Sequence, residues 1–114
     1  MYEYNATVLE VVDGDTVRLE VDLGFKVSIV TSCRLHGINA PELHAPDPKP
    51  GQAAKDTLLK LLSLSGKVRV ITIKDAREKY GRMLAKLYVD PDAESLNDKM
   101  IRLGHAVAYF GGPR

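Results

Sequence analysis

The sequence is poor in cysteine, in long apolar runs and in excess charge of either sign. Its single cysteine, Cys33, excludes an internal disulfide and a zinc site built from cysteines. No apolar run approaches the length of a membrane span, and Met1 is not followed by the pattern of an export signal. We therefore expect no membrane partner and a cytoplasmic location, or secretion if the chain is a mature form. The net charge of +1 argues against a surface that binds polyanions everywhere, but it allows a local basic patch.

What the sequence does contain is typical of one soluble domain. Its 114 residues are 45% apolar and 27% charged, enough for a single core. We expect residues 1–114 to form a single domain, with a monomer as the default state. The segment 105–114 is expected to be a frayed tail, because it ends in Gly111, Gly112 and Pro113.

The first third of the chain predicts a meander of three strands. Residues 4–12 are rich in β-branched residues, and residues 26–36 form the third strand. Between them Val17, Leu19 and Val21 alternate with charged residues, as in a strand with one wet face. The turn Asp13-Gly14-Asp15-Thr16 predicts a hairpin, in which we expect Gly14 to supply a positive φ.

The rest of the chain predicts two helices and two further strands. Residues 43–52 hold three prolines and read as an irregular loop. Helical spacing then predicts a buried face on Ala54, Leu58, Leu61 and Leu62. Residues 67–74 and 83–89 read as strands. Ser95 with Asp98 three residues later predicts the start of a second helix, whose apolar residues are Leu96, Met100, Ile101 and Leu103 and which ends at Gly104.

This order of elements predicts an α+β, mainly β fold. Five strands with a helix between the third and fourth, and a second helix after the fifth, are the order of an OB-type Greek-key barrel. We prefer a barrel to an open sheet, because closure removes most of the edges that five short strands would leave.

The stretch from Arg34 to Glu42 carries the first candidate site. It begins as a strand and leaves the sheet near Asn39, because Pro41 removes a backbone donor and restricts Ala40. A carboxylate beyond a strand end can accept a proton from water, and a guanidinium can bind two phosphate oxygens. Taken singly, Arg34 and Glu42 are more simply a surface arginine and a solvated glutamate.

Two other segments carry polar groups suited to chemistry. Asp13 and Asp15 could present two carboxylates to a hard cation, although an isolated Asp-Gly-Asp-Thr is more simply a turn. The segment from Lys79 to Arg82 could bind through its two cations and the ring of Tyr80. The alternative interpretation is a charged hairpin tip. Tyr80 and Tyr109 are the two tyrosines best placed to contact a base. None of the three histidines is assigned a catalytic role, and Cys33 is expected to be a buried apolar side chain.

Taken together, the motifs resemble one family. Val12-Asp13-Gly14-Asp15-Thr16-Val17, Arg34-Leu35-His36-Gly37-Ile38-Asn39-Ala40-Pro41-Glu42 and Lys79-Tyr80-Gly81-Arg82 occur in this order at suitable spacings. This resembles the staphylococcal nuclease (thermonuclease) family, from about residue 5 to about residue 110. The resemblance implies an OB-type barrel that hydrolyses DNA and RNA with calcium.

The resemblance also implies a role for each matching residue. It makes Asp15 a calcium ligand, with Asp13 close to the metal. Glu42 matches the family's proposed general base. Arg34 and Arg82 match the two arginines that hold the scissile phosphate. Lys79 and Tyr80 match family positions that contact the bound nucleotide. Tyr109 matches another such position if a one-residue gap is allowed in the alignment.

Two positions depart from the family pattern. Asn39 stands where well-known members have an aspartate ligand, and Ala40 stands where they have a threonine that offers its backbone carbonyl. Any residue supplies a carbonyl, and an amide oxygen is still a hard ligand, so we expect weaker calcium binding rather than none.

The sequence therefore predicts a calcium-dependent nuclease of low sequence specificity that leaves 3′-phosphate products. We expect its nucleic-acid partner to be DNA or RNA, with unpaired strands favoured. The alternative is an OB-type module that binds nucleic acid with weak catalysis or none, which the neutral Asn39 favours.

Overall fold

The computed structural model describes residues 2–62, 66–73 and 83–110. The elements in chain order are β1 (Glu3–Asp13), β2 (Thr16–Gly24), β3 (Val27–Leu35), β4 (Ile38–Asn39), α1 (Lys49–Leu62), β5 (Lys67–Thr72), β6 (Met83–Tyr88), α2 (Leu96–Arg102) and β7 (Val107–Ala108). Among these described residues, no helix is both long enough and apolar enough to span a membrane.

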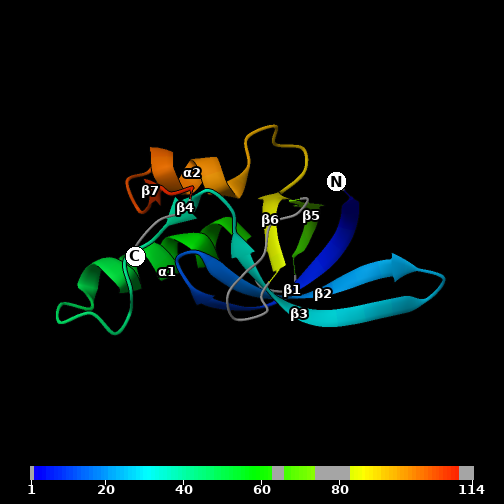
Figure 1. Ribbon diagram of the computed structural model, residues 1–114, viewed down its shortest axis with the longest axis horizontal. Coiled ribbons are helices and arrows are strands. Elements are labelled where there is room, and N and C mark those ends of the chain that lie inside the picture. Colours follow the sequence, from blue (N-terminus) through cyan, green and yellow to red (C-terminus); the bar gives the residue numbers. More distant parts are fainter. Residues whose placement is uncertain (1, 63–65, 74–82, 111–114) are drawn as a thin grey trace.

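Five strands close into a barrel in the order β1-β2-β3-β6-β5 (Figure 1). The first three strands are antiparallel neighbours, as the meander predicts, and β3 then pairs with β6 in parallel over Cys33–Leu35. A two-stranded sheet of β4 and β7 lies beside the barrel. The predicted OB-type barrel, with one helix between its third and fourth strands and one after its fifth, is confirmed.

Alternation along β2 builds the barrel core. Val17, Leu19 and Val21 are at most 1% exposed, whereas the charged residues between them are exposed. The helix α1 adds Ala54, Leu58 and Leu62 to this core. The predicted buried face of α1 is therefore correct, except that Leu61 is only partly buried at its margin.

The helix α1 begins earlier than the sequence predicts. The segment 43–52 was predicted to be an irregular loop, but the helix starts at Lys49, whose N–H donates to Asp47 Oδ1 at 3.1 Å. Pro50 is compatible with this start, because a backbone N–H in the first helical turn has no helical partner to lose. This earlier start places the first turn of α1 next to the backbone of Glu42.

The helix α2 has the predicted N-terminal cap. Ser95 Oγ accepts a hydrogen bond from the N–H of Asp98 at 3.1 Å, and Gly104 ends the segment with a φ of 81°. The buried side of α2 consists of Leu96, Asn97 and Met100. Leu103, predicted to lie on this buried side, is instead 43% exposed because it is the C-cap residue.

The segment after α2 is ordered where the sequence suggests fraying. Val107 and Ala108 form β7, which pairs with β4. Ala108 lies opposite Ile38, and Val107 lies opposite Asn39. The imidazole of His105 lies 3.0 Å from Thr57 Oγ1 of α1. Backbone hydrogen bonds therefore hold residues 107–109 against β4 and the turn before it, and residues 111–114 lie outside the described residues.

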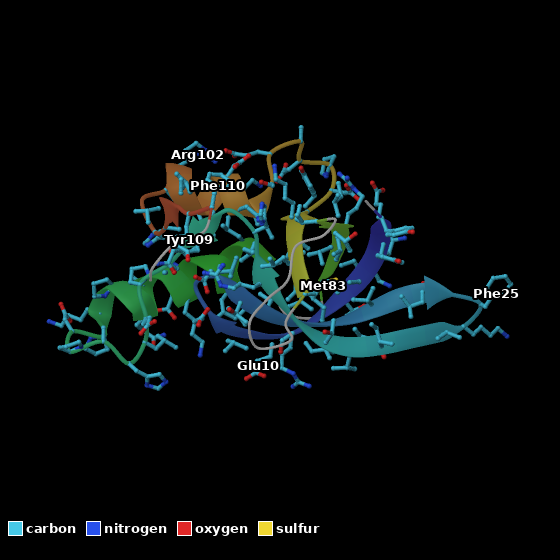
Figure 2. All side chains as sticks on the ribbon, viewed as in Figure 1. Glu10, Phe25, Met83, Arg102, Tyr109 and Phe110 are labelled. Atoms are coloured by element: carbon cyan, nitrogen blue, oxygen red, sulfur yellow. The ribbon has the colours of Figure 1, made fainter. Side chains whose placement is uncertain are left out.

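The β2–β3 hairpin extends well beyond the barrel as an arm (Figure 1). It makes the molecule elongated, with extents of 45 × 29 × 24 Å. Its tip is Phe25, which is fully exposed (Figure 2). Phe25 and Lys26 both have positive φ, 52° and 63°, which is the backbone of the two-residue turn that matches the twist of a hairpin.

Candidate active site

Arg34 is at the centre of the candidate site, at the end of β3. Its side chain is 2% exposed, and one guanidinium nitrogen, Nη2, lies 3.4 Å from both Asp15 Oδ2 and Asn39 Oδ1. The barrel register explains this placement, because Arg34 on β3 pairs with Thr16, the residue that follows Asp15. The structure therefore brings together three residues that the sequence assigned to the site.

The carboxylate of Asp15 is held by donors from three segments. Besides Arg34, its Oδ2 accepts the N–H of Ala40 at 2.9 Å, and its Oδ1 accepts the hydroxyl of Thr16 at 3.1 Å. The backbone carbonyl of Asp15 also accepts the N–H of Leu35 at 2.8 Å. Because Asp15 is only 7% exposed, these donors stabilise a buried negative charge and fix its direction.

Asp13 lies next to Asp15, as expected. Its Oδ1 accepts the N–H of Asp15 at 3.1 Å. Burial, followed by the hydrogen bond and the negative charge of the Asp15 side chain, raises the pKa of Asp13 from 3.8 to about 6. The Asp13 carboxyl group is therefore protonated more readily than a free aspartate, and a bound cation would favour its charged form.

Gly14, between the two aspartates, is required for a reason that the sequence did not predict. We expected a positive φ, but Gly14 is not among the glycines that have one. Instead it lies against α1 and the Asn39–Pro41 segment: a Cβ atom would be 2.6 Å from Ala54 Cβ and 2.8 Å from Ala40 Cβ. Small side chains at these three positions allow the hairpin, the helix and the strand end to meet at the site.

Glu42 is exposed in the loop between β4 and α1. Its backbone packs under the first turn of α1, where a Cβ on Gly51 would lie 2.6 Å from the Glu42 carbonyl oxygen. An exposed carboxylate two residues beyond the buried Ala40 can reach water at the edge of the site. The early start of α1 therefore positions the loop that carries Glu42.

The oxygen groups of the predicted ligands suit a hard cation. They are the carboxylate of Asp15, the amide oxygen of Asn39 and the backbone carbonyl of Ala40, which are ligand types that calcium takes. Among the residues the structure describes, no group of three or more His, Cys, Asp or Glu could hold a metal by itself. A cation at this site would therefore depend on amide and carbonyl oxygens, as the presence of Asn39 implies.

The other predicted site residues are placed less completely. Arg82, Lys79 and Tyr80 lie outside the described residues. Tyr109 follows β7, and its N–H donates to Gly37 O at 2.8 Å, which fixes its backbone beside the turn from β3 to β4 (Figure 2). An open pocket of about 280 Å³ lies between residues 39–41 and residues 104–107, adjoining the candidate ligands.

Two titratable residues near Arg34 have no chemical role in this arrangement. Burial, together with the positive charges of Lys86 and Arg34, lowers the pKa of His36, whose ring packs edge-on against Phe110 at a centroid distance of 6.0 Å. Cys33 is completely buried, and burial raises its pKa to about 12. The expectation that Cys33 is a buried apolar side chain is confirmed.

Sequence reasoning missed the supporting residues of the site. Asn97 Nδ2 donates to His36 O at 2.8 Å and to Ala85 O at 3.1 Å, and its Oδ1 accepts the N–H of Leu87 at 3.2 Å. It thus fastens α2 to β6 and to the turn after Arg34. The available signal was a polar residue between Leu96 and Met100 on a helix face that is otherwise apolar.

Comparison with known proteins gives consistent results. The sequence model of a family described as "Staphylococcal nuclease homologue" matches residues 32–113. Among curated proteins, the chain is 31% identical over 119 residues to "Endonuclease YhcR" of Bacillus subtilis (strain 168). The match covers 97% of this chain but only 9% of that relative, so the chain spans a small part of the relative's length.

Proposed function

Because the chain belongs to the staphylococcal nuclease family, we propose that it hydrolyses phosphodiester bonds of DNA and RNA in a calcium-dependent reaction. We further propose little sequence preference, a preference for unpaired strands and 3′-phosphate products. The observation that carries the proposal is the position of Arg34, with one nitrogen 3.4 Å from both Asp15 and Asn39. This arrangement puts a phosphate-binding group beside candidate metal ligands.

In this proposal the metal-binding and proton-transfer roles fall to different segments. Asp15, Asn39 and the carbonyl of Ala40 would hold calcium, which when bound supplies Lewis-acid stabilisation of the phosphate oxygens. Glu42 would accept the proton of the attacking water, a contribution of about 10²- to 10⁴-fold in rate. Its exposure and its fixed backbone are consistent with that task.

Arg34 would stabilise charge that grows on the phosphoryl oxygens during the reaction. Donors aimed at developing charge lower the barrier most when they are already oriented, and the contacts of Arg34 to Asp15 and Asn39 orient it. Arg82 is proposed as the second arginine, and Lys79, Tyr80 and Tyr109 as contacts to the rest of the nucleotide. Contacts of this kind go to phosphate and sugar, so little sequence preference follows.

The test is an assay of single-stranded DNA and RNA cleavage with calcium and with a chelator. We expect cleavage that requires calcium, and its absence at millimolar calcium would disprove the proposal. Glu42→Gln should lose at least about a hundredfold in kcat, because it removes the proton acceptor. Glu10→Gln, an equal charge change at an exposed glutamate on β1, should leave the rate unchanged (Figure 2).

A second candidate is a module that binds nucleic acid without cleaving it. The observation in its favour is that Arg34 is 2% exposed and ion-paired with Asp15, as in a purely structural pair. Asn39, which lacks a formal charge, points the same way. Retention of an oligonucleotide on the protein, with no cleavage in calcium, would support this candidate over the first.

A further inference from the structure

Among the described residues, one half of β3 has a neighbouring strand on one side only. On one side β3 pairs with β2 from Val27 to Arg34. On its other side β6 pairs only with Cys33–Leu35. Within the described part of the chain, the segment Val27–Ser32 therefore has no strand along its outer side, and it forms the free edge of the projecting arm (Figure 1).

This edge lacks the residues that usually prevent strands from adding to a sheet. The segment reads Val-Ser-Ile-Val-Thr-Ser, with no charge and no proline. Its apolar side chains are exposed: Val27 by 52%, Ile29 by 44% and Val30 by 53%. Proteins normally protect such edges with lysine, proline or a covering element, because unpaired N–H and C=O groups accept another strand.

A second strand of the same barrel provides the contrast. In the described part of the chain, the later half of β1, from Leu9 to Asp13, also lies beyond the pairing with β5, which ends at Thr7. That half, however, carries charged side chains at Glu10 and Asp13. The chain thus carries charged side chains along the later half of β1 and none along Val27–Ser32.

We propose that Val27–Ser32 is a self-association edge, at which two copies of this chain pair their β3 strands in antiparallel orientation. A two-fold axis brings the same segment against itself, and a segment without charge places no like charges together. Exposed apolar residues occur at odd and even positions, so they lie on both faces of the arm. The β3 strand of a second copy would present its apolar residues on the same two faces.

The contact would be distant from the chemistry. The arm extends from the barrel to Phe25 at its far tip (Figure 2), whereas Arg34 lies near the opposite end of β3. Association through the arm would join two barrels into one continuous sheet and leave both candidate sites open. Self-association and nuclease activity are therefore independent, and a failure of one proposal does not affect the other.

The experiment is sedimentation equilibrium of the full chain over a concentration series, with Val30→Lys as the test variant. We expect a monomer–dimer equilibrium for the parent chain. Val30→Lys should weaken the dimer by at least about tenfold, because it brings two like charges together across the axis. Leu23→Lys is the matched control, since Leu23 is an exposed apolar residue of the same arm on β2, and it should dimerise like the parent chain.

Amide hydrogen exchange distinguishes edge pairing from other modes of association. Backbone amides of Val27–Ser32 should gain protection as the concentration rises, whereas those of the turn at Phe25 should not. A chain that is monomeric throughout the series would overturn the proposal. So would a dimer that persists in Val30→Lys, or one that protects another surface. Circular dichroism of both variants checks that the fold is retained.

Discussion

The first turn of α1 meets the backbone of Glu42 at Gly51, so closely that a Cβ atom there would lie 2.6 Å from the carbonyl oxygen of Glu42. The same Cβ would lie 3.0 Å from the N–H nitrogen of Leu43. Real Cβ atoms do not approach backbone atoms this closely, and backbone cannot move aside as a flexible side chain can. The start of the helix and the loop that carries the proposed base are thus fitted to each other.

Gly51→Ala should therefore impair catalysis by moving Glu42. We expect a fall in kcat of about tenfold or more with a smaller change in KM, because the loop shifts while the phosphate-binding groups stay in place. Steady-state kinetics on single-stranded DNA measures this. Gln52→Ala, the neighbouring exposed position of α1, should leave kcat unchanged. Equal loss in both variants would show that helix stability, rather than the position of Glu42, is responsible.

Gly14→Ala should destabilise the fold at the point where the hairpin meets α1. The added methyl would contact Ala54 Cβ at 2.6 Å, and such overpacking costs about 1–3 kcal/mol. In the double variant Gly14→Ala/Ala54→Gly, the loss should be smaller than the sum of the two single losses, since one clash is removed. Denaturant unfolding of the four proteins gives the coupling. Strict additivity would mean that the two positions do not meet.

Asn39→Asp should strengthen calcium binding. It adds one formal negative charge beside Asp15, and ligand charge count sets calcium affinity, so we expect about a tenfold gain. Isothermal titration with calcium measures the affinity. Asn5→Asp is the matched control, because Asn5 is an exposed asparagine on β1 and gives the same change in net charge. Identical affinities in the two variants would remove Asn39 from the ligand set.

Asp13 should make the calcium-free protein less stable as the pH rises. Burial and the neighbouring Asp15 raise its pKa from 3.8 to about 6 in the folded state. Between about pH 4 and about pH 6 the folded state therefore binds more protons than the unfolded state, so this group's contribution to stability falls as the pH increases. Asp13→Asn should remove that slope and raise Tm at pH 7. Thermal unfolding in a chelator, across this range, provides the check.

Cys33 should be unreactive in the folded protein. Its side chain is fully buried and its pKa is raised to about 12, so little thiolate forms and reagents cannot reach it. Alkylation by iodoacetamide at pH 8 should be at least about a hundredfold slower than in denaturant. Mass spectrometry follows a single site, since the chain has one cysteine. Rapid labelling under native conditions would contradict the burial of β3 at this point.

The barrel was predictable because its signals are local. Alternation of Val17, Leu19 and Val21 with charged residues fixes which face of β2 is buried, and the Ser95 cap fixes where α2 begins. Where the prediction was wrong, contacts beyond the local segment decided. Lys49–Gln52 are helical in spite of the prolines around them, and Val107 pairs with Asn39 in spite of the glycines that follow.

The strand pattern, the family and the identity of the polar residues in each motif can all be read from the residue order alone. How those residues meet depends on the folded chain: barrel register places Arg34 next to Thr16, and so within 3.4 Å of Asp15. The folded chain also decides why Gly14 and Gly51 are glycines. A Cβ atom at Gly14 would collide with the Cβ atoms of Ala40 and Ala54, and one at Gly51 would collide with the backbone of Glu42. Such contacts join residues far apart in the chain, and no local pattern of residues records them.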